Sequence, residues 1–254
     1  MREWIYGRNP VYEALRARRR HFFQLHIARG VKEKGRLQEI VDLCQLKKIR
    51  IQHPPRERFA PLGSGHQGVA LQVSGYPYRS LGEIFKLAQQ RGEPPFILIL
   101  DALQDPQNLG ALLRTAEAVG VHGACLPLRR TATITPAVVS SSSGASEHLI
   151  ITQTNLAQVI AQLKERGLWV IGLERGPEAK LPNQVRLDGP IALVVGNEGQ
   201  GMRALVRKSC DVLMQLPMRG RVGSLNAAVA GSVALYLVWE TRGFSSPKTI
   251  DEEN

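Results

Sequence analysis

The chain has 254 residues, of which 43% are hydrophobic and 22% charged, and its formal net charge is +11. This composition is typical of a folded globular protein, and the length allows one large or two modest α/β domains. The first residues, MREWIYGRNP, carry charge and proline where a secretory signal needs an apolar stretch, and no later run approaches the ~18 apolar residues of a membrane span. The chain is therefore predicted to be cytoplasmic, without a membrane partner. Its three cysteines form no CxxC pair, so neither a disulfide framework nor a zinc site is expected.

The positive charge is concentrated at the amino terminus. Residues 1–60 contain 15 Lys and Arg against 6 Asp and Glu, so this quarter of the chain carries +9 of the net charge. Clustered cations with adjacent aromatics, as in RRRHFF, suit a nucleic acid whose phosphates are neutralised and whose bases can stack. The alternative is a solvated helix end whose phenylalanines face the core. The candidate contacts are Arg8, Arg16, Arg18, Arg19 and Arg20.

Residues 1–75 predict a small α/β unit. Apolar residues recur at helical spacing in some segments and form short strand-like runs in others. Helices are expected at 10–18 and 35–48, and strands at 22–28, 49–53 and 68–73. Residues 76–92 combine glycine and prolines with a short amphipathic helix and are predicted to form a linker.

Residues 93–245 predict a second, larger α/β domain. Strands are expected at 96–103, 124–128, 149–153, 168–174, 191–196 and 212–217, and helices at 108–120, 155–167 and 224–240. Continuous apolar strands separated by helices predict a mostly parallel sheet with helices on both faces. Ligands of such sheets bind at the carboxyl ends of the strands. The polar tail at 246–254 is predicted to be disordered.

A glycine-rich turn, VVGNEGQGM at 194–202, follows one of these strands. Its glycines spell G-x-x-G-x-G, the reverse of the dinucleotide fingerprint, and no Gly-Lys-Ser/Thr occurs in the chain. A dinucleotide oxidoreductase and a triphosphate P-loop are therefore excluded. Glu198 in this turn would repel a phosphate unless a metal intervened, and no cluster of metal ligands lies nearby. The turn predicts a ligand without phosphate and no bound metal.

Two further turns follow strands and carry polar residues. After the first, Asn108 precedes apolar positions of a helix on which Arg114 lies off the apolar stripe. After the second, Ser224 precedes the last helix. Asn108 and Ser224 could simply cap these helices, and Arg114 taken alone could be a surface charge.

Together the three turns resemble the signature motifs of the SpoU, or TrmH-like, ribose 2′-O-methyltransferases of the SPOUT class. The matching segments are NLGALLRTAEAVGV, LVVGNEGQGM and QLPMRGRVGSLNAAVA, and YGRNPVYEAL and HQGVAL near the amino terminus also look like this family. The resemblance is closest to the 23S rRNA guanosine 2′-O-methyltransferases. It implies a carboxy-terminal trefoil knot and an amino-terminal substrate-binding domain similar to an RNA-binding ribosomal protein.

The resemblance also implies S-adenosylmethionine as the cofactor. In this family its adenine lies among backbone groups of three loops, which here contain Gly196, Leu216 and Leu225. Small residues are needed because the cofactor lies against main chain. The candidate cofactor-binding residues are Gly196, Asn197, Gly201, Leu216, Ser224 and Leu225.

Five residues are implied to act in catalysis. The resemblance makes Arg114 the catalytic arginine, with Asn108 holding Arg114 or the ribose. Glu198 would hold Arg114 or orient the substrate, although a helix N-terminal carboxylate is the alternative. Ser224 and Asn226 would hydrogen-bond the cofactor tail or the substrate. Because family members are dimers in which this arginine can complete the partner's site, a homodimer is predicted.

The nature of the substrate stays open at this point. Arg129 and Arg130, ahead of the serine-rich segment TPAVVSSSSGASEHL, are either RNA contacts or solvated charges. The separate basic amino-terminal unit favours 23S rRNA over transfer RNA, which is the alternative substrate. A non-catalytic RNA-binding assembly protein is the rival function, but it has no reason to keep all five candidate catalytic residues.

Overall fold

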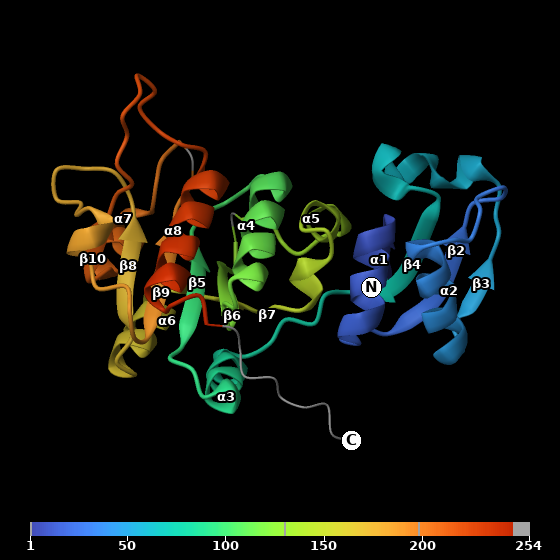
Figure 1. The fold of residues 1–254 in the computed structure, drawn as a ribbon, viewed down its shortest axis with the longest axis horizontal. Coiled ribbons are helices and arrows are strands. Elements are labelled where there is room, and N and C mark those ends of the chain that lie inside the picture. Colours follow the sequence, from blue (N-terminus) through green and yellow to red (C-terminus); the bar gives the residue numbers. More distant parts are fainter. Residues whose placement is uncertain (1, 130, 198, 246–254) are drawn as a thin grey trace. The chain divides into compact units, whose positions relative to one another are not determined.

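The computed structural model describes residues 2–129, 131–197 and 199–245. They form two compact units (Figure 1). Unit 1 contains the residues up to Pro77 together with Ile134–His148, and unit 2 contains Tyr78–Thr133 and the residues from Leu149 onward. The predicted tail at 246–254 lies outside the described residues. No helix in the described part of the chain is long and apolar enough to cross a membrane.

Unit 1 is built on a four-stranded sheet with the order β1-β4-β2-β3. Strands β2 and β3 are parallel, and the other neighbours are antiparallel. The predicted helices and strands of residues 1–75 are present, and the structure adds a first strand, a short helix from the serine-rich segment and three 3-10 turns. The elements are β1 (Arg2–Tyr6), α1 (Arg8–Ala17), β2 (Phe22–Ile27), α2 (Arg36–Leu46), β3 (Arg50–Gln52), η1 (Arg56–Leu62), η2 (Ser64–His66), β4 (Val69–Ser74), α5 (Pro136–Ser141) and η3 (Ala145–Glu147).

The two faces of this sheet differ in composition because side chains alternate along each strand. On one face Ile5, Leu25 and Leu71 are fully buried. Helices α1 and α2 pack together, and they contact β4 and β3, respectively. The opposite face carries Trp4, Gln72 and other polar or aromatic residues that a two-residue repeat places there.

Arg20 is part of the interior of unit 1. It is only 5% exposed, and its guanidinium donates to both carboxylate oxygens of Glu147 at 2.8 and 2.7 Å and to Glu3 at 3.0 Å. The neighbouring Arg19 donates to the hydroxyl of Tyr76 and the carbonyl of Glu147. The prediction that Arg20 contacts RNA is therefore wrong, because its charge is used to bind the segment 134–148 to the unit.

Unit 2 has a six-stranded sheet with the order β10-β8-β9-β5-β6-β7, and all its neighbouring strands are parallel. The predicted parallel sheet and its six strands are confirmed. Two short elements, α7 and η4, were not predicted. The elements are α3 (Leu81–Arg91), β5 (Phe96–Leu100), α4 (Pro106–Ala118), β6 (Gly123–Pro127), β7 (Ile150–Thr154), α6 (Leu156–Glu165), β8 (Trp169–Leu173), η4 (Pro182–Gln184), β9 (Ile191–Val195), α7 (Ala204–Ser209), β10 (Val212–Met214) and α8 (Ala227–Thr241).

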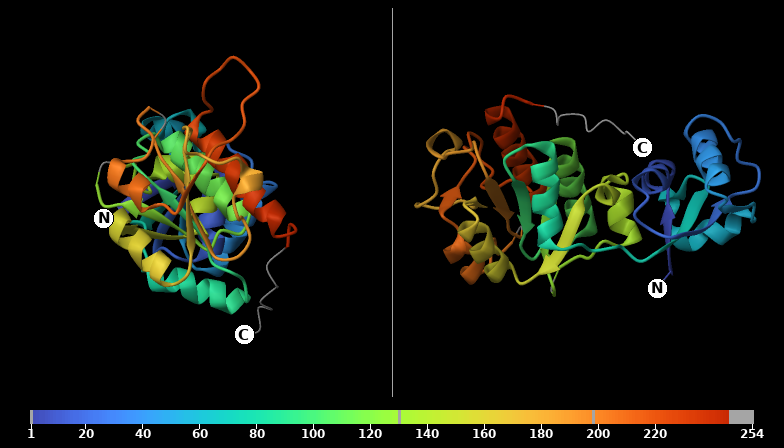
Figure 2. Two further views of the ribbon diagram at one scale, coloured as in Figure 1. Left: turned by 90° about the vertical axis from the view of Figure 1, so that its left-hand side faces the viewer. Right: turned by 90° about the horizontal axis from the view of Figure 1, so that it is seen from below.

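Helices cover both faces of this sheet, as its fully buried strands require. Helices α4 and α8 pack together on one side, and α6 and α7 pack together on the other (Figure 2). Gly231 lets α8 approach closely, because a Cβ there would lie 2.5 Å from the Leu112 side chain and 3.2 Å from Val195. The carboxyl ends of β8, β9 and β10 lie next to the start of α8.

Replacing Glu147 with glutamine should strongly destabilise unit 1. The variant leaves the buried Arg20 without a full counter-charge, and breaking a buried ion pair costs about 3–5 kcal/mol. Urea unfolding compares it with Glu13→Gln, which removes a more exposed carboxylate that His148 contacts at 2.9 Å. That control should lose less than about 1 kcal/mol. Equal losses in both variants would contradict the structural role of the buried pair.

Candidate active site

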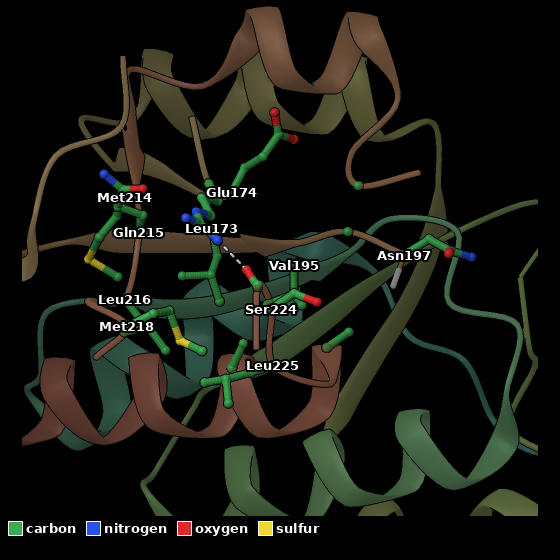
Figure 3. A pocket seen from close by; sticks show the side chains of 16 residues that line it. Leu173, Glu174, Val195, Asn197, Met214, Gln215, Leu216, Met218, Ser224 and Leu225 are labelled. Carbon is green, nitrogen blue, oxygen red and sulfur yellow. Dashed lines mark hydrogen bonds between the residues drawn. The ribbon is translucent and has the colours of Figure 1, made fainter. Parts of the chain in front are cut away.

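A pocket lies at the carboxyl ends of β8, β9 and β10, beside the start of α8 (Figure 3). Asn197 lies at one end of it, and Met214 and Gln215 lie at the other. All six predicted cofactor-binding residues line it. The lining residues that the structure describes are Leu173, Glu174, Arg175, Val195, Gly196, Asn197, Gly201, Met214, Gln215, Leu216, Met218, Gly223, Ser224, Leu225, Ala227 and Ala230.

Gly196 forms the tightest part of the pocket wall. A Cβ at this position would lie 2.5 Å from the carbonyl carbon of Gly201 and 2.5 Å from the amide nitrogen of Met202. Backbone atoms cannot move aside as a flexible side chain can, so only glycine fits. The turn is closed by reciprocal backbone hydrogen bonds of 3.1 and 3.0 Å between Asn197 and Gly201. Gly201 has a φ of +67°, which also favours glycine.

The side chain of Asn197 fixes this turn in place. Its amide nitrogen donates to the carbonyl of Ala102 at 3.1 Å, and its oxygen accepts from the Gly199 N–H at 2.8 Å. The first bond joins the turn after β9 to the loop after β5, the neighbouring strand. Glu198 and Arg130 lie outside the described residues, so their roles stay predictions.

Two charged residues that were not predicted, Glu174 and Arg175, hold the surrounding loops. Glu174 lines the pocket, accepts from Arg207 at 2.7 Å and contacts the Met202 N–H at 3.4 Å. Arg175 donates to the carbonyl of Gly223. Glu174 and Arg175 directly follow β8. Because ligands of parallel sheets bind at the carboxyl ends of strands, this position could have marked them as site residues.

Asp101 holds the end of the glycine-rich turn through Arg203. It is fully buried at the end of β5, and its carboxylate accepts from the backbone N–H and the guanidinium of Arg203, each at 2.7 Å. Arg203 precedes α7, so this pair fixes the chain leaving the glycine-rich turn. A lone aspartate after an apolar strand gave little indication of this role.

Helices α4 and α8 are not capped by Asn108 and Ser224, the two residues that the capping alternative names. Asp105, not Asn108, caps α4 by accepting from the Gln107 N–H. Asn226, not Ser224, caps α8 by accepting from the N–H groups of Ala228 and Val229 at 2.9 and 3.1 Å. Ser224 instead lines the pocket.

Asn226 and Asn108 are brought together although 118 residues separate them. The side-chain nitrogen of Asn226 donates to the side-chain oxygen of Asn108 at 3.0 Å. This bond joins the first turn of α4 to the start of α8. Two of the predicted catalytic residues therefore share one hydrogen bond next to the pocket.

Arg114 lies on the exposed side of α4, two turns after the helix start. It is not among the described residues that line the pocket of its own chain. At about 100° per residue, its side chain leaves the helix about 120° away from that of Asn108. The structure thus brings Asn108 and Asn226 together beside the pocket that Ser224 lines, and Arg114 is exposed on the same helix as Asn108.

The pocket walls combine apolar side chains with backbone groups. Leucine, valine and methionine side chains form much of the lining, and polar atoms come mainly from turns. Such a pocket suits a flat ligand with apolar faces and polar edges. Among the described residues, no group of three or more His, Cys, Asp or Glu is placed to hold a metal ion.

The predicted RNA contacts of unit 1 and Arg129 differ in their accessibility. Arg16, Arg18 and Arg129 are exposed, and Arg8 and Arg19 are half-buried. Arg16 also lies over the ring of Tyr12 at 5.7 Å. Apart from Arg20, these side chains remain accessible to a ligand, and their contact with RNA stays a prediction.

Comparison with known proteins places the chain in a family. Residues 95–236 match the SpoU rRNA Methylase family, and residues 4–79 match the family model for RNA 2′-O ribose methyltransferase substrate binding. The chain belongs to the SpoU family of RNA methyltransferases. The resemblance of its three turns to the SpoU motifs is confirmed.

Individual proteins are similar to this chain over much of its length. YacO of Bacillus subtilis, named a TrmH family tRNA/rRNA methyltransferase, is 42% identical over 244 residues, which cover 94% of this chain and 96% of YacO. The crystal structure of the SpoU methyltransferase AviRb from Streptomyces viridochromogenes, in complex with AdoMet, has a TM-score of 0.79 at 21% identity and covers 96% of this chain and 91% of AviRb. The TrmH/SpoU tRNA modifying enzyme of A. aeolicus has a TM-score of 0.54 at 27% identity and covers 68% of this chain and 92% of its own.

Two substitutions of Asn226 separate its capping role from its bond to Asn108. Asn226→Ala removes both and should destabilise unit 2 by about 0.5–2 kcal/mol. Asn226→Asp keeps an acceptor for the helix N–H groups but cannot donate to Asn108. It should therefore retain most of the free energy of unfolding of unit 2 and change the conformation of residues 105–110. Urea unfolding measures the first effect, and amide chemical shifts of residues 105–110 measure the second. If Asn226→Asp left these shifts unchanged, the bond to Asn108 would not hold the loop.

Proposed function

We propose that this protein is an S-adenosylmethionine-dependent methyltransferase that methylates a ribose 2′-hydroxyl in RNA, namely a guanosine of 23S rRNA. The observation that carries this proposal is that all six residues that the family motifs predicted for the cofactor line one and the same pocket. The proposed domains are a substrate-binding domain over 1–75, a linker over 76–92 and a catalytic domain over 93–245. In the structure, α3 of the linker packs in unit 2, and Ile134–His148 packs in unit 1.

The pocket fits this cofactor in chemistry. Gly196 lets the turn close on itself at the pocket wall, since a Cβ there would meet the backbone of Gly201 and Met202 at 2.5 Å. Apolar lining from Leu216, Met218 and Leu225 suits the faces of an adenine. When bound, the cofactor supplies an activated methyl group. The residues of this chain would bind it and exclude water from it.

Arg114 is proposed to act on the RNA. Transfer to a ribose hydroxyl requires the oxygen to be held in line and to lose its proton, and such positioning is worth about 7–11 kcal/mol. A guanidinium has a pKa above about 12 and no acceptor, so it is a poor base. Arg114 would instead hold the phosphate next to the target ribose and stabilise the developing alkoxide, with that phosphate as the proton relay.

A homodimer would bring Arg114 to a pocket. Helix α8 exposes Val229, Val233 and Tyr236 to 49%, 42% and 47%, and their spacing places them on one side of the helix. A soluble chain covers such a stripe most simply with a second copy. The exposed position of Arg114 on α4, which packs on α8, fits the proposal that it completes the partner's site.

A trefoil knot is part of the same proposal. After the edge strand β10 the chain returns past β8 and β9 and packs α8 against α4. The glycine contacts at Gly196 and Gly231 are of the kind that closely threaded backbone requires.

The amino-terminal unit supports a large RNA as the substrate. The tRNA modifying enzyme of A. aeolicus matches only 68% of this chain, so this chain has additional structure for contact beyond the reacting nucleotide. The basic charge of residues 1–60 extends over that part. Transfer RNA is the alternative substrate, and a non-catalytic assembly protein is the alternative function.

The direct test is methyl transfer from labelled cofactor to unmodified ribosomal and transfer RNA, followed by mass spectrometry of the nucleosides. Labelled 2′-O-methylguanosine in 23S rRNA is the expected product. Arg114→Lys keeps the charge but loses the planar fork, so it should slow transfer about 100-fold or more. Arg186→Lys, at an exposed arginine outside the pocket, is the matched control. An absence of labelled product from both RNA classes would favour the assembly protein.

A second prediction concerns the pocket and the dimer. Leu225→Arg places a cation in the cofactor pocket and should abolish the heat of cofactor binding in calorimetry, whereas Leu205→Arg, at a leucine that is 65% exposed and outside the pocket, should not. Mixed dimers of Arg114→Ala and Leu225→Arg chains contain one intact site if Arg114 acts across the interface. They should recover about half of the wild-type activity. Inactive mixed dimers would show that Arg114 serves the pocket of its own chain.

A further inference from the structure

The open face of the unit 1 sheet carries an unusual set of side chains. In one register row Trp4 and Gln24 flank Gln72, and in the next row Tyr6 and His26 flank Ala70. These residues alternate with the buried Ile5, Leu25 and Leu71 of the opposite face. The open face is covered only in part, by the turn η1, whose Phe59 is buried with Ala70.

A cavity of about 460 Å³ lies between this face and η1. This volume is within the range of about 300–1,000 Å³ that small-molecule sites occupy. Its walls come from all four strands of the sheet and from η1. The residues that matter for its chemistry are Trp4, Gln24, His26, Gln52, Arg58 and Leu62.

The cavity offers an aromatic surface. The rings of Trp4 and His26 have their centroids 4.5 Å apart and are tilted by 42°. Leu62 and Phe59 add apolar area on the side of η1. Each nucleobase has a π-face, and stacking of a base on an aromatic side chain is a general mode of single-strand recognition.

The cavity also offers hydrogen-bonding groups that the protein leaves unused. Two glutamines, Gln24 and Gln52, line the cavity. Gln24 donates to Gln72 at 3.0 Å, which leaves the carbonyl oxygen of Gln24 with capacity for further bonds. Burial, and then the charge of Arg58, lower the pKa of His26, and a side-chain hydrogen bond with Gln52 opposes this shift. The amides of Gln24 and Gln52 carry both donors and acceptors, as the edge of a base does.

We propose that this cavity binds one unpaired base of the RNA substrate, with Trp4 and His26 as the stacking surface and the exposed Arg58 beside the backbone phosphate. The proposal rests on the proposed function in so far as RNA is the substrate. An unpaired base is required because a base inside a duplex does not present its face. The site lies entirely within unit 1 and is separate from the cofactor pocket of unit 2.

The test uses the full chain and six-nucleotide RNAs of A, C or U, compared with an abasic hexamer of ribose phosphate. Fluorescence anisotropy at constant salt should show the base-bearing RNAs binding at least about fivefold more tightly than the abasic hexamer. Trp4→Leu should remove this difference and leave the affinity for the abasic hexamer unchanged. Trp169→Leu makes the same exchange at an exposed tryptophan of β8 outside the cavity, so it is the matched control and should retain the difference.

A second variant protects the test against misfolding. His26→Gln keeps a polar side chain and should weaken base-bearing RNAs with an unchanged circular dichroism spectrum. Equal binding of base-bearing and abasic RNAs to the wild type, or an unchanged difference in both variants, would overturn the proposal. Free adenosine monophosphate competing as strongly as the hexamer would also overturn it, since the site would then take a free nucleotide.

The methyl-transfer assay separates this proposal from the proposed function. If the cavity binds a base of the substrate, Trp4→Leu should raise the KM for RNA severalfold with little change in kcat. Wild-type transfer with an unchanged KM in Trp4→Leu would contradict the cavity and leave the function intact. Base-dependent binding without transfer to any RNA would contradict the function and leave the cavity intact.

Discussion

The architecture of the pocket depends on the absence of a side chain at Gly196. At this point two stretches of backbone meet so closely that a single Cβ would lie 2.5 Å from main-chain atoms of Gly201 and Met202. The turn that follows is then fixed by Asn197, and its exit by the pair of Asp101 and Arg203. A wall made of backbone cannot adapt by rotamer changes, so it presents its N–H and C=O groups in one fixed arrangement. Such rigidity is what a selective cofactor site requires.

Much of the fold follows from local patterns in the sequence. The central strands of unit 2, such as β5 (FILIL) and β9 (IALVV), are continuous apolar runs, because a parallel sheet buries both of its faces. The pocket residues were also predictable, since three turns with unusual glycine, asparagine and serine content follow strand ends and match family motifs. Strand β1 was missed because REWIY mixes charged and aromatic residues, which become regular only when their alternation is read against β4.

Other features depend on contacts that no local pattern records. The arginine run was expected to face RNA, but Arg20 binds Glu147, which lies 127 residues further along the chain. The capping alternative for Asn108 and Ser224 does not hold, because Asp105 and Asn226 cap the two helices. Glu174 and Arg175 were missed because an acidic and a basic residue after a strand are common, and only the folded loops show their partners.

The segment Ile134–His148 belongs to unit 1 although both of its flanking segments belong to unit 2. The chain therefore leaves unit 2 and returns to it, and unit 1 lacks Val138, Val139 and Glu147 until this excursion is made. On the ribosome, the amino-terminal unit cannot be finished when its own contiguous sequence has emerged. It must wait for more than half of the polypeptide, so the two units are coupled in the order of their synthesis as well as in their connectivity.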